Sequence, residues 1–380
     1  MALGPSSSAQ MGRSTYAWDD WGPRQDLQSV IVMETILDAE PQTDLVVLNG
    51  DLITGENTFL ENSTDYVDQL VQPMVRRGLT WASAYGNHDN DVNISAALIL
   101  AREQTYPNAR TAQMLPDPDA GVSNYYLPVY PPTCTPSRNS PAACPPALLL
   151  WFFDSRGGFH YNQTAPKTPL PNWVSPRAAS WFRTTNAALV ATFNNNSTPI
   201  PALAFVHIPT NASLALQQRG IHPHREPGID DDGPVARQAQ VVCPDDGGST
   251  PGGGDAPDDG VKCEYGGQDG AFMAALAETE GLLAVFSGHD HGATWCGAWE
   301  EGGVFLCFGQ HTGYGGYGSW IRGGGQVVVS MEGLRDGVVE TWVRLESGEV
   351  VGQVVLNGTY GRDWYPRTRN EKTRLPRGGG

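Results

Sequence analysis

The sequence lacks long hydrophobic runs and is poor in basic residues. No apolar stretch approaches the roughly 18 residues that a membrane-spanning helix needs, so we expect no membrane span. Lys and Arg total 24 against 41 Asp and Glu, which gives a formal net charge of −17. Nucleic acid would repel so acidic a chain, and we expect it to bind none.

The first residues lack the basic segment and apolar core of a signal peptide. We also find no apolar strand there, and expect residues 1–23 to be unstructured or mis-assigned. Asp19 and Asp20 are the only carboxylates of this segment before the "WGPRQD" stretch, and without a buried strand ahead of them we do not expect them to bind metal.

No two cysteines have the C-x-x-C spacing of a zinc or redox site. The six cysteines instead form three close pairs, each closing a Pro- or Gly-rich loop: Cys134 with Cys144, Cys243 with Cys263, and Cys296 with Cys307. Six cysteines allow fifteen pairings, and we predict the nearest-neighbour one. Such bridges indicate an oxidising compartment.

Seven N-x-S/T sequons point the same way, because they accept glycans in secreted proteins. They lie at Asn62, Asn93, Asn162, Asn195, Asn196, Asn211 and Asn357. We therefore expect a glycoprotein that is secreted or resides in the secretory pathway.

Apolar runs alternate with helix-like segments, which is typical of an α/β protein with a parallel or mixed sheet. We expect helices over 24–41, 65–78 (interrupted or kinked at Pro73), 175–193 and 268–280, and strands over 43–51, 79–89, 147–155, 200–209, 282–290, 302–310, 325–333 and 337–345. One domain would span 24–360, with loop insertions at 130–146 and 243–263 and a flexible tail at 361–380.

Polar side chains follow four of the expected strands where each one ends. They are Asp51 after Gly50, the "GNHD" of residues 86–89, His207, and the histidines of "GHDH" at 289 and 291. In an open α/β sheet, ligands bind at the carboxyl ends of the strands. A turn or a hydrogen-bonded polar strand end could explain each motif alone, but the ordered set favours a site for a hard or borderline divalent metal.

These motifs, in this order over roughly residues 24–345, resemble those of the calcineurin-like metallophosphoesterase family. The wider match, through "LNGDLITGEN", "TWASAYGNHDND" and "HTGYGGYGSW", resembles its fungal secreted branch related to purple acid phosphatases. The resemblance implies a four-layer α/β/β/α sandwich of two mixed sheets. It also implies hydrolysis of a small phosphorylated substrate, a phosphomonoester by preference, at a centre of two divalent or trivalent ions (Mn, Fe or Zn) that activate water.

Carried over by motif, Asp51 would bridge the two ions, and His291 would bind the second. Asn87, His207 and His289 would complete the first site. A bridging carboxylate and neutral ligands would leave positive charge to attract the phosphate.

The "GNHD" motif also implies two catalytic residues. His88 would lie near the substrate and stabilise the transition state or protonate the leaving oxygen, and Asp89 would orient His88. Purple members of the family carry a tyrosinate three residues after the Gly-Asp aspartate. Thr54 occupies that position here, so we expect no purple absorption band.

The family's first motif, an Asp-x-His after the first strand, is absent before Asp51. This absence suggests that the first strand itself is missing, and the second ion would keep only Asp51 and His291. An alternative is thus an impaired or inactive protein with a phosphoesterase fold, and a further alternative is a phosphodiesterase or nucleotidase.

The Gly-rich stretch after residue 310 could form a rim over the site. We expect substrate contact from His311 or Tyr314 there. His160, His222 and His224 lie in polar loops, and we expect them to be solvated rather than metal-bound.

Overall fold

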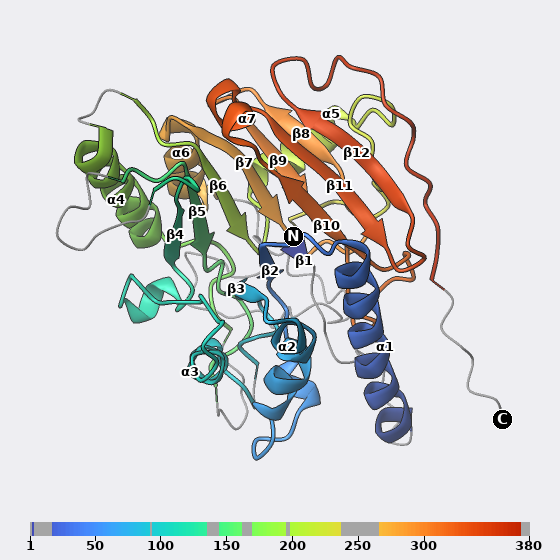
Figure 1. Cartoon of the computed structure of the whole chain (residues 1–380). Helices are drawn as coiled ribbons and strands as arrows, with labels where there is room; N and C mark the ends of the chain where they lie inside the picture. Colours follow the sequence, from blue (N-terminus) through green and yellow to red (C-terminus); the bar gives the residue numbers. More distant parts are fainter. Residues whose placement is uncertain are drawn as a thin grey trace.

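The computed structural model describes residues 2–3, 17–91, 93–134, 144–161, 169–194, 198–236 and 266–373. Its strands form two six-stranded sheets, and helices lie on the outer face of each (Figure 1). The four layers confirm the predicted α/β sandwich of two mixed sheets.

The first sheet has the strand order β12-β11-β10-β1-β2-β3. Parallel pairing joins β1 (Ala2–Leu3), β2 (Leu45–Asn49) and β3 (Thr80–Ala84). Antiparallel pairing joins β10 (Gly323–Val328), β11 (Val339–Leu345) and β12 (Val350–Leu356), and also β10 to β1.

The second sheet has the order β4-β5-β6-β7-β9-β8. Four parallel strands form its centre: β5 (Leu148–Phe153), β6 (Ala202–Val206), β7 (Leu282–Ser287) and β9 (Val304–Phe308). The edges are antiparallel, β4 (Tyr125–Val129) on one side and β8 (Cys296–Trp299) on the other.

The helices cover the two outer faces. On the first sheet lie α1 (Ala17–Ala39), α2 (Asp65–Arg77) and α3 (Ala96–Glu103), and on the second α4 (Pro176–Asn194), α5 (Asn211–Arg219) and α6 (Gly270–Glu278). Short helices are η1 (Gly55–Asn57), η2 (Pro118–Ala120) and α7 (Met331–Asp336). The three larger apolar cores among the described residues lie one under each helical layer and one between the sheets, and Ile321, Val343 and Leu345 form a fourth, small one.

Strand β5 shows why the central strands read as continuous apolar runs. Leu149, Trp151 and Phe153 face the core under α4 and α6, whereas Leu148, Leu150 and Phe152 face the core between the sheets. Successive side chains of a strand point to opposite faces, and here both faces are covered.

The first strand, which the sequence suggested to be missing, is present as two residues. Ala2 pairs with Val47 of β2 and with Gly325 of β10, so this short strand fills the centre of the first sheet. Helix α1 begins at Ala17, ahead of the predicted start at residue 24. The prediction that residues 1–23 are unstructured is thus wrong for 2–3 and 17–23.

Three further predictions need correction. The expected strand 325–333 ends at Val328, and the helix α7 follows it. Helix α2 continues through Pro73, so the predicted interruption is absent, whereas the predicted kink there stays a prediction. The expected flexible tail is docked up to residue 373, because Ile321 donates to the Glu371 carbonyl and Thr373 donates to the Ser319 carbonyl.

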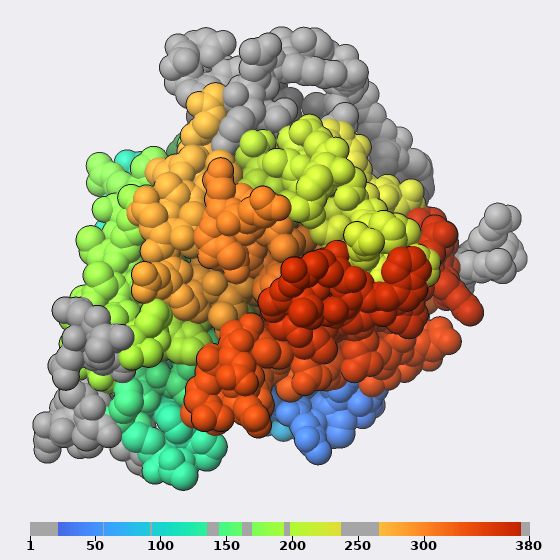
Figure 2. All heavy atoms as spheres, turned by 90° about the horizontal axis from the view of Figure 1, so that it is seen from above, coloured from blue at the N-terminus to red at the C-terminus, as the bar shows by residue number. Residues whose placement is uncertain are grey.

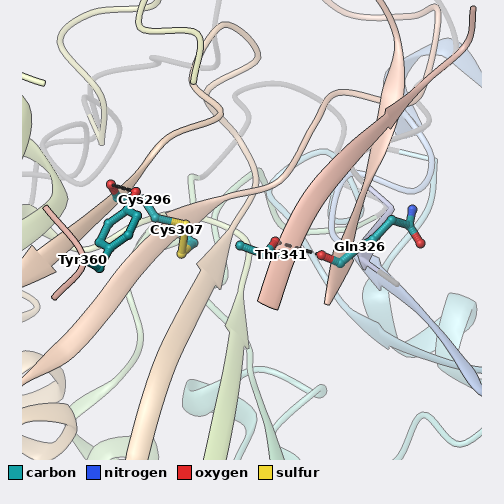
Figure 3. The surroundings of a disulfide bond; sticks show 5 residues. All are labelled: Cys296, Cys307, Gln326, Thr341 and Tyr360. Carbon is teal, nitrogen blue, oxygen red and sulfur yellow. Dashed lines mark hydrogen bonds between the residues drawn. A yellow bond between two sulfur atoms is a disulfide. The ribbon is translucent and has the colours of Figure 1, made fainter. Parts of the chain in front are cut away.

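Two predicted disulfides, Cys134–Cys144 and Cys296–Cys307, are present. The second joins directly opposed residues of β8 and β9 in the core between the sheets, where Tyr360 donates its hydroxyl to the Cys296 carbonyl (Figure 3). The predicted Cys243–Cys263 pair lies outside the described residues, as do the sequons at Asn162, Asn195 and Asn196.

The upper face of the molecule brings together two distant parts of the chain. Residues near 222 lie against the segment after β12 (Figure 2), where His224 stacks on Trp364 at 4.4 Å and pairs with the Tyr365 carbonyl at 2.9 Å. His222 is exposed.

Within the described residues, no helix has the length and apolar character to cross a membrane.

A buried carboxylate, Glu103, supports the strand that leads into the "GNHD" motif. It accepts hydrogen bonds from Trp81 Nε1 (2.8 Å), Ser83 Oγ (2.7 Å), Tyr85 Oη (2.6 Å) and Thr111 Oγ1 (3.3 Å).

Removing the Glu103 carboxylate would leave these buried donors unpaired beside a cavity. We expect Glu103→Ala to lower the free energy of unfolding by about 3–5 kcal/mol, measured by urea denaturation. Glu103→Gln, which keeps one acceptor oxygen, should lose less, and equal stability of Glu103→Ala and the parent chain would contradict this role.

Asp26 on α1 lines a small cavity beside Leu52 and Ile53, which follow Asp51. Burial raises the pKa of Asp26 to about 6. The folded chain therefore binds this proton more tightly than the unfolded chain, and stability falls as the pH rises from about 4 to about 6. We expect Asp26→Asn to stabilise the protein by about 1–3 kcal/mol at pH 7 and to lose this advantage toward pH 4. Urea denaturation at both pH values tests this, with the exposed Asp44→Asn as control; a pH-independent difference would contradict it.

Candidate metal centre

The carboxyl ends of strands from both sheets converge on one site. Asp51 follows β2, Asn87 follows β3, His207 follows β6 and His289 follows β7. Asn49, the last residue of β2, links the sheets there: its Nδ2 donates to the Phe286 carbonyl at 3.0 Å. This hydrogen bond ties the end of β2, which Asp51 follows, to the end of β7, which His289 follows.

Asp51, His207 and His289 form the centre of the site, and all three are buried. Asp51 Oδ2 lies 2.9 Å from His207 Nε2, and His289 Nδ1 lies 3.3 Å from the same nitrogen. One ligand atom from each residue lies within 4.8 Å of the others, and in the described part of the chain no other group of three or more His, Cys, Asp or Glu is so close. A single cation could contact all three.

Asn87, next to His88 in the loop after β3, carries a buried side-chain oxygen that is a candidate fourth ligand. Its Oδ1 is buried and has no hydrogen-bond partner among the described residues. A buried polar atom without a partner is costly, so such an atom in a native site points to a ligand. The neighbouring amide of His88 donates to Asp51 Oδ1 at 2.9 Å, which fixes this loop against the carboxylate.

The tautomer of His207 also suits metal binding. Its Nδ1 lies 2.8 Å from the Asn49 carbonyl, which can only accept, so Nδ1 carries the proton. Burial opposes a charge on this ring, but the Asp51 carboxylate 2.9 Å from Nε2 raises the pKa of His207 and favours a proton on Nε2 as well, which a bound cation would displace. Histidine ligands in proteins commonly have their other nitrogen held in this way.

Glycines allow the close packing of these side chains. A Cβ at Gly50 would lie 2.2 Å from His207 Nδ1, and one at Gly86 would lie 2.3 Å from Asp51 Oδ1. The backbone is strained at the ligands themselves, since Asp51 has φ 50° and His289 has φ 68°. Non-glycine residues adopt this left-handed region rarely, and such strain concentrates at functional sites.

The ionisable groups of the site shift one another's pKa values. Burial alone would raise the pKa of Asp51, but the charge of His207, followed by His88 and His289, holds it well below its usual range. Burial lowers the pKa of His289 well below its ordinary value, and the His207 charge adds to this effect. Asp51 is thus an ionised carboxylate and His289 a neutral imidazole. A cation bound here would displace the proton held between Asp51 and His207.

Asp89 differs from its predicted role. Its Oδ1 accepts hydrogen bonds from the amides of Leu52 (2.8 Å) and Ile53 (3.0 Å), and its Oδ2 accepts one from Gly86 (2.8 Å). Both oxygens are therefore engaged with backbone amides rather than with His88. Asp89 ties the loop after β2 to the loop after β3 and so positions Asp51 and Asn87.

His291 lies in a stack of three rings beside this centre. Its ring packs on Tyr317 at 4.1 Å between centroids and on His311 at 3.8 Å. Its Nδ1 lies 2.9 Å from the Tyr317 carbonyl, which leaves the Nε2 lone pair free for a ligand. Tyr317 was not among the residues predicted for the site. It lies in the Gly-rich stretch after His311, and that stretch was the sequence feature that pointed to it.

Tyr314 is placed differently from its predicted contact with substrate. Its hydroxyl pairs with Glu346 and with Thr373 Oγ1 at 3.0 Å, so the ring serves the docked C-terminal segment. His311 is 1% exposed and belongs to the stack rather than to an open rim. His160 is exposed, as predicted.

The donor set fits a metal ion at the first site. One carboxylate, one amide oxygen and two imidazoles are ligands that suit Mn, Fe or Zn. At the second site the fit is poorer, because β1 ends at Leu3 and the sequence holds no Asp, Glu or His before Asp19. Of the predicted ligands, only Asp51 and His291 remain for a second ion.

Sequence comparisons identify relatives along most of the chain, although no family model matches it. It is 25% identical over 338 residues to an Arabidopsis thaliana protein named probable inactive purple acid phosphatase 29, covering 84% of this chain and 74% of that protein. It is 26% identical over 342 residues to probable inactive purple acid phosphatase 14 of the same plant, covering 84% and 73%.

The fold has its own counterpart among solved structures. A dimetal phosphatase from Danio rerio superposes over 93% of this chain and 98% of its own, with a TM-score of 0.50 and 12% sequence identity. At that identity the likeness concerns the fold. This chain is therefore similar in sequence to two plant proteins named probable inactive purple acid phosphatases, and it has the fold of a solved dimetal phosphatase.

Proposed function

We propose that this protein binds divalent metal at Asp51, Asn87, His207 and His289 and hydrolyses phosphoesters, phosphomonoesters first among them. The observation that supports this most strongly is the buried group of Asp51, His207 and His289, whose ligand atoms lie within 4.8 Å of one another. A small phosphorylated molecule is the substrate we infer.

Metal ions at such a site lower the pKa of water and offset the charge of a phosphoryl group. The chain's own residues would do the rest. His88 is half-buried beside Asp51, and we propose that its imidazole reaches the substrate and donates a proton to the leaving oxygen. Asp89 holds the loops of Asp51 and Asn87 together through three backbone amides.

A second candidate is a protein that binds metal but turns over poorly. Two observations favour it: the sequence after β1 offers no Asp-x-His, and both Arabidopsis relatives carry "probable inactive" in their names. The two candidates differ in turnover rather than in the first metal site.

Removing metal tests the proposal. We expect chelation to abolish hydrolysis of p-nitrophenyl phosphate and added Mn²⁺, Fe²⁺ or Zn²⁺ to restore it, with weaker turnover of bis(p-nitrophenyl) phosphate. Faster turnover of the diester would favour a phosphodiesterase. Metal binding without turnover of either ester would favour the poorly active candidate, and hydrolysis that survives complete removal of metal would contradict both.

We further propose that the protein works in an oxidising, secretory environment. The disulfides Cys134–Cys144 and Cys296–Cys307 support this. Release of N-glycans from protein made in a eukaryotic secretion host should lower its mass, and an unchanged mass would count against the glycoprotein assignment.

A further inference from the structure

His311 is a buried histidine whose ring nitrogens have no evident use within the protein. It follows β9, three residues after Phe308, and is 1% exposed. Neither ring nitrogen has a hydrogen-bond partner of normal geometry among the described residues, although the Gly315 backbone lies close enough to interact with the ring. An imidazole buried without partners is costly, and this cost calls for an explanation.

The neighbour of His311 is His291, a residue already at the metal centre. The two ring centroids are 3.8 Å apart and the planes are inclined by 32°. Tyr317 stacks on the opposite face of His291, and its carbonyl holds the Nδ1 proton of that ring. His291 is thus fixed in place with its Nε2 lone pair available beside His311.

One positive charge acts on this pair of imidazoles. The guanidinium of Arg322 interacts electrostatically with both His291 and His311. The same guanidinium would repel an incoming ion, so a cation held here would bind more weakly than at Asp51, His207 and His289.

We propose that His291 and His311 together bind a second metal ion, His311 supplying a ligand that the residues after β1 do not provide. This inference rests on the proposed function and extends it. Two nitrogen ligands favour Zn²⁺ or Co²⁺ over Mg²⁺. Solvent or substrate oxygens would complete the coordination, and Asp51 would be the bridging carboxylate.

The alternative use of His311 is mechanical, as a stacking partner that positions His291. His311→Phe separates the two, because it keeps an aromatic ring of similar size in the stack and removes both nitrogens. His311→Gln serves as a second variant in case the phenyl ring disturbs packing, and His224→Phe is the matched control at a distant stacked histidine. Circular dichroism and thermal denaturation confirm folding of each.

The measurement is metal content and Co²⁺ titration of the full chain, followed by elemental analysis and the visible Co²⁺ spectrum. We expect about two ions per chain in the parent and in His224→Phe. In His311→Phe and His311→Gln we expect one ion, or a second-ion Kd raised by about 100-fold or more. Two ions with unchanged affinity in both His311 variants would overturn the inference, as would a single ion in the parent. A parent that binds one ion retains the proposed first site, whereas a parent that binds none overturns the proposed function as well.

Discussion

Replacing Asp51 with asparagine is expected to remove metal binding and to lower phosphoesterase activity on the order of a thousandfold. Asp51 is the carboxylate of the buried group, with one oxygen 2.9 Å from His207 and the other accepting the His88 amide at 2.9 Å. An amide cannot offer two anionic oxygens to cations. Hydrolysis of p-nitrophenyl phosphate and metal content by elemental analysis measure the two effects.

The Asp51→Asn variant should stay folded, because asparagine has nearly the same shape and His207 can give up its proton once the carboxylate is gone. Asp44→Asn, at an exposed acid before β2, is the matched control and should change neither quantity. Unchanged metal content in Asp51→Asn would exclude the proposed role of this residue.

The substitution Gly86→Ala, which adds one methyl group, is expected to lower phosphoesterase activity almost as much as Asp51→Asn. The added Cβ would lie 2.3 Å from Asp51 Oδ1, 2.5 Å from Asp51 N and 2.7 Å from His207 Cδ2, so two ligands would have to move. We expect Gly86→Ala to reduce activity by about 100-fold or more, since small displacements of catalytic groups have effects of that size. Overpacking should also cost about 1–3 kcal/mol of stability.

Gly270→Ala is the matched control for this substitution. Gly270 opens α6, and a Cβ there would meet nothing within 4 Å. It should leave activity unchanged and stability unchanged or slightly higher. If Gly86→Ala retained full metal content and activity, the tight packing around Asp51 would have no functional importance.

The sequence was informative about the site wherever a ligand directly follows an apolar strand. Asp51, Asn87, His207 and His289 all meet this condition, and parallel strands bring their carboxyl ends to one edge. The four layers were implied by the family resemblance, and the continuous apolar run of β5 agrees with them because both faces of that strand are covered.

Other features depended on partners that are distant in the sequence. Asp89 was expected to orient His88, yet its oxygens accept the amides of Leu52, Ile53 and Gly86, which no spacing rule indicates. The stacking of Tyr317 on His291 also depends on the fold, and no spacing in the sequence predicts it.

The ends of the chain were predicted least well. The strand β1 has two residues and carries too few side chains for any periodicity, and its position follows from the backbone groups of β2 and β10 that it pairs. The tail at 361–380 was expected to be flexible. In the structure Asp231 accepts hydrogen bonds from Lys372 at 2.8 Å and Asn370 at 2.9 Å, so those polar residues hold it in place.

A crystal of the full chain soaked in Mn²⁺ or Zn²⁺, with anomalous scattering recorded at the metal edge, would locate the cation itself. We predict a peak in contact with Asp51, Asn87, His207 and His289, at about 2.0–2.3 Å from the ligand atoms. No peak there at saturating metal, or a peak confined to another part of the molecule, would show that these four residues do not form a metal centre.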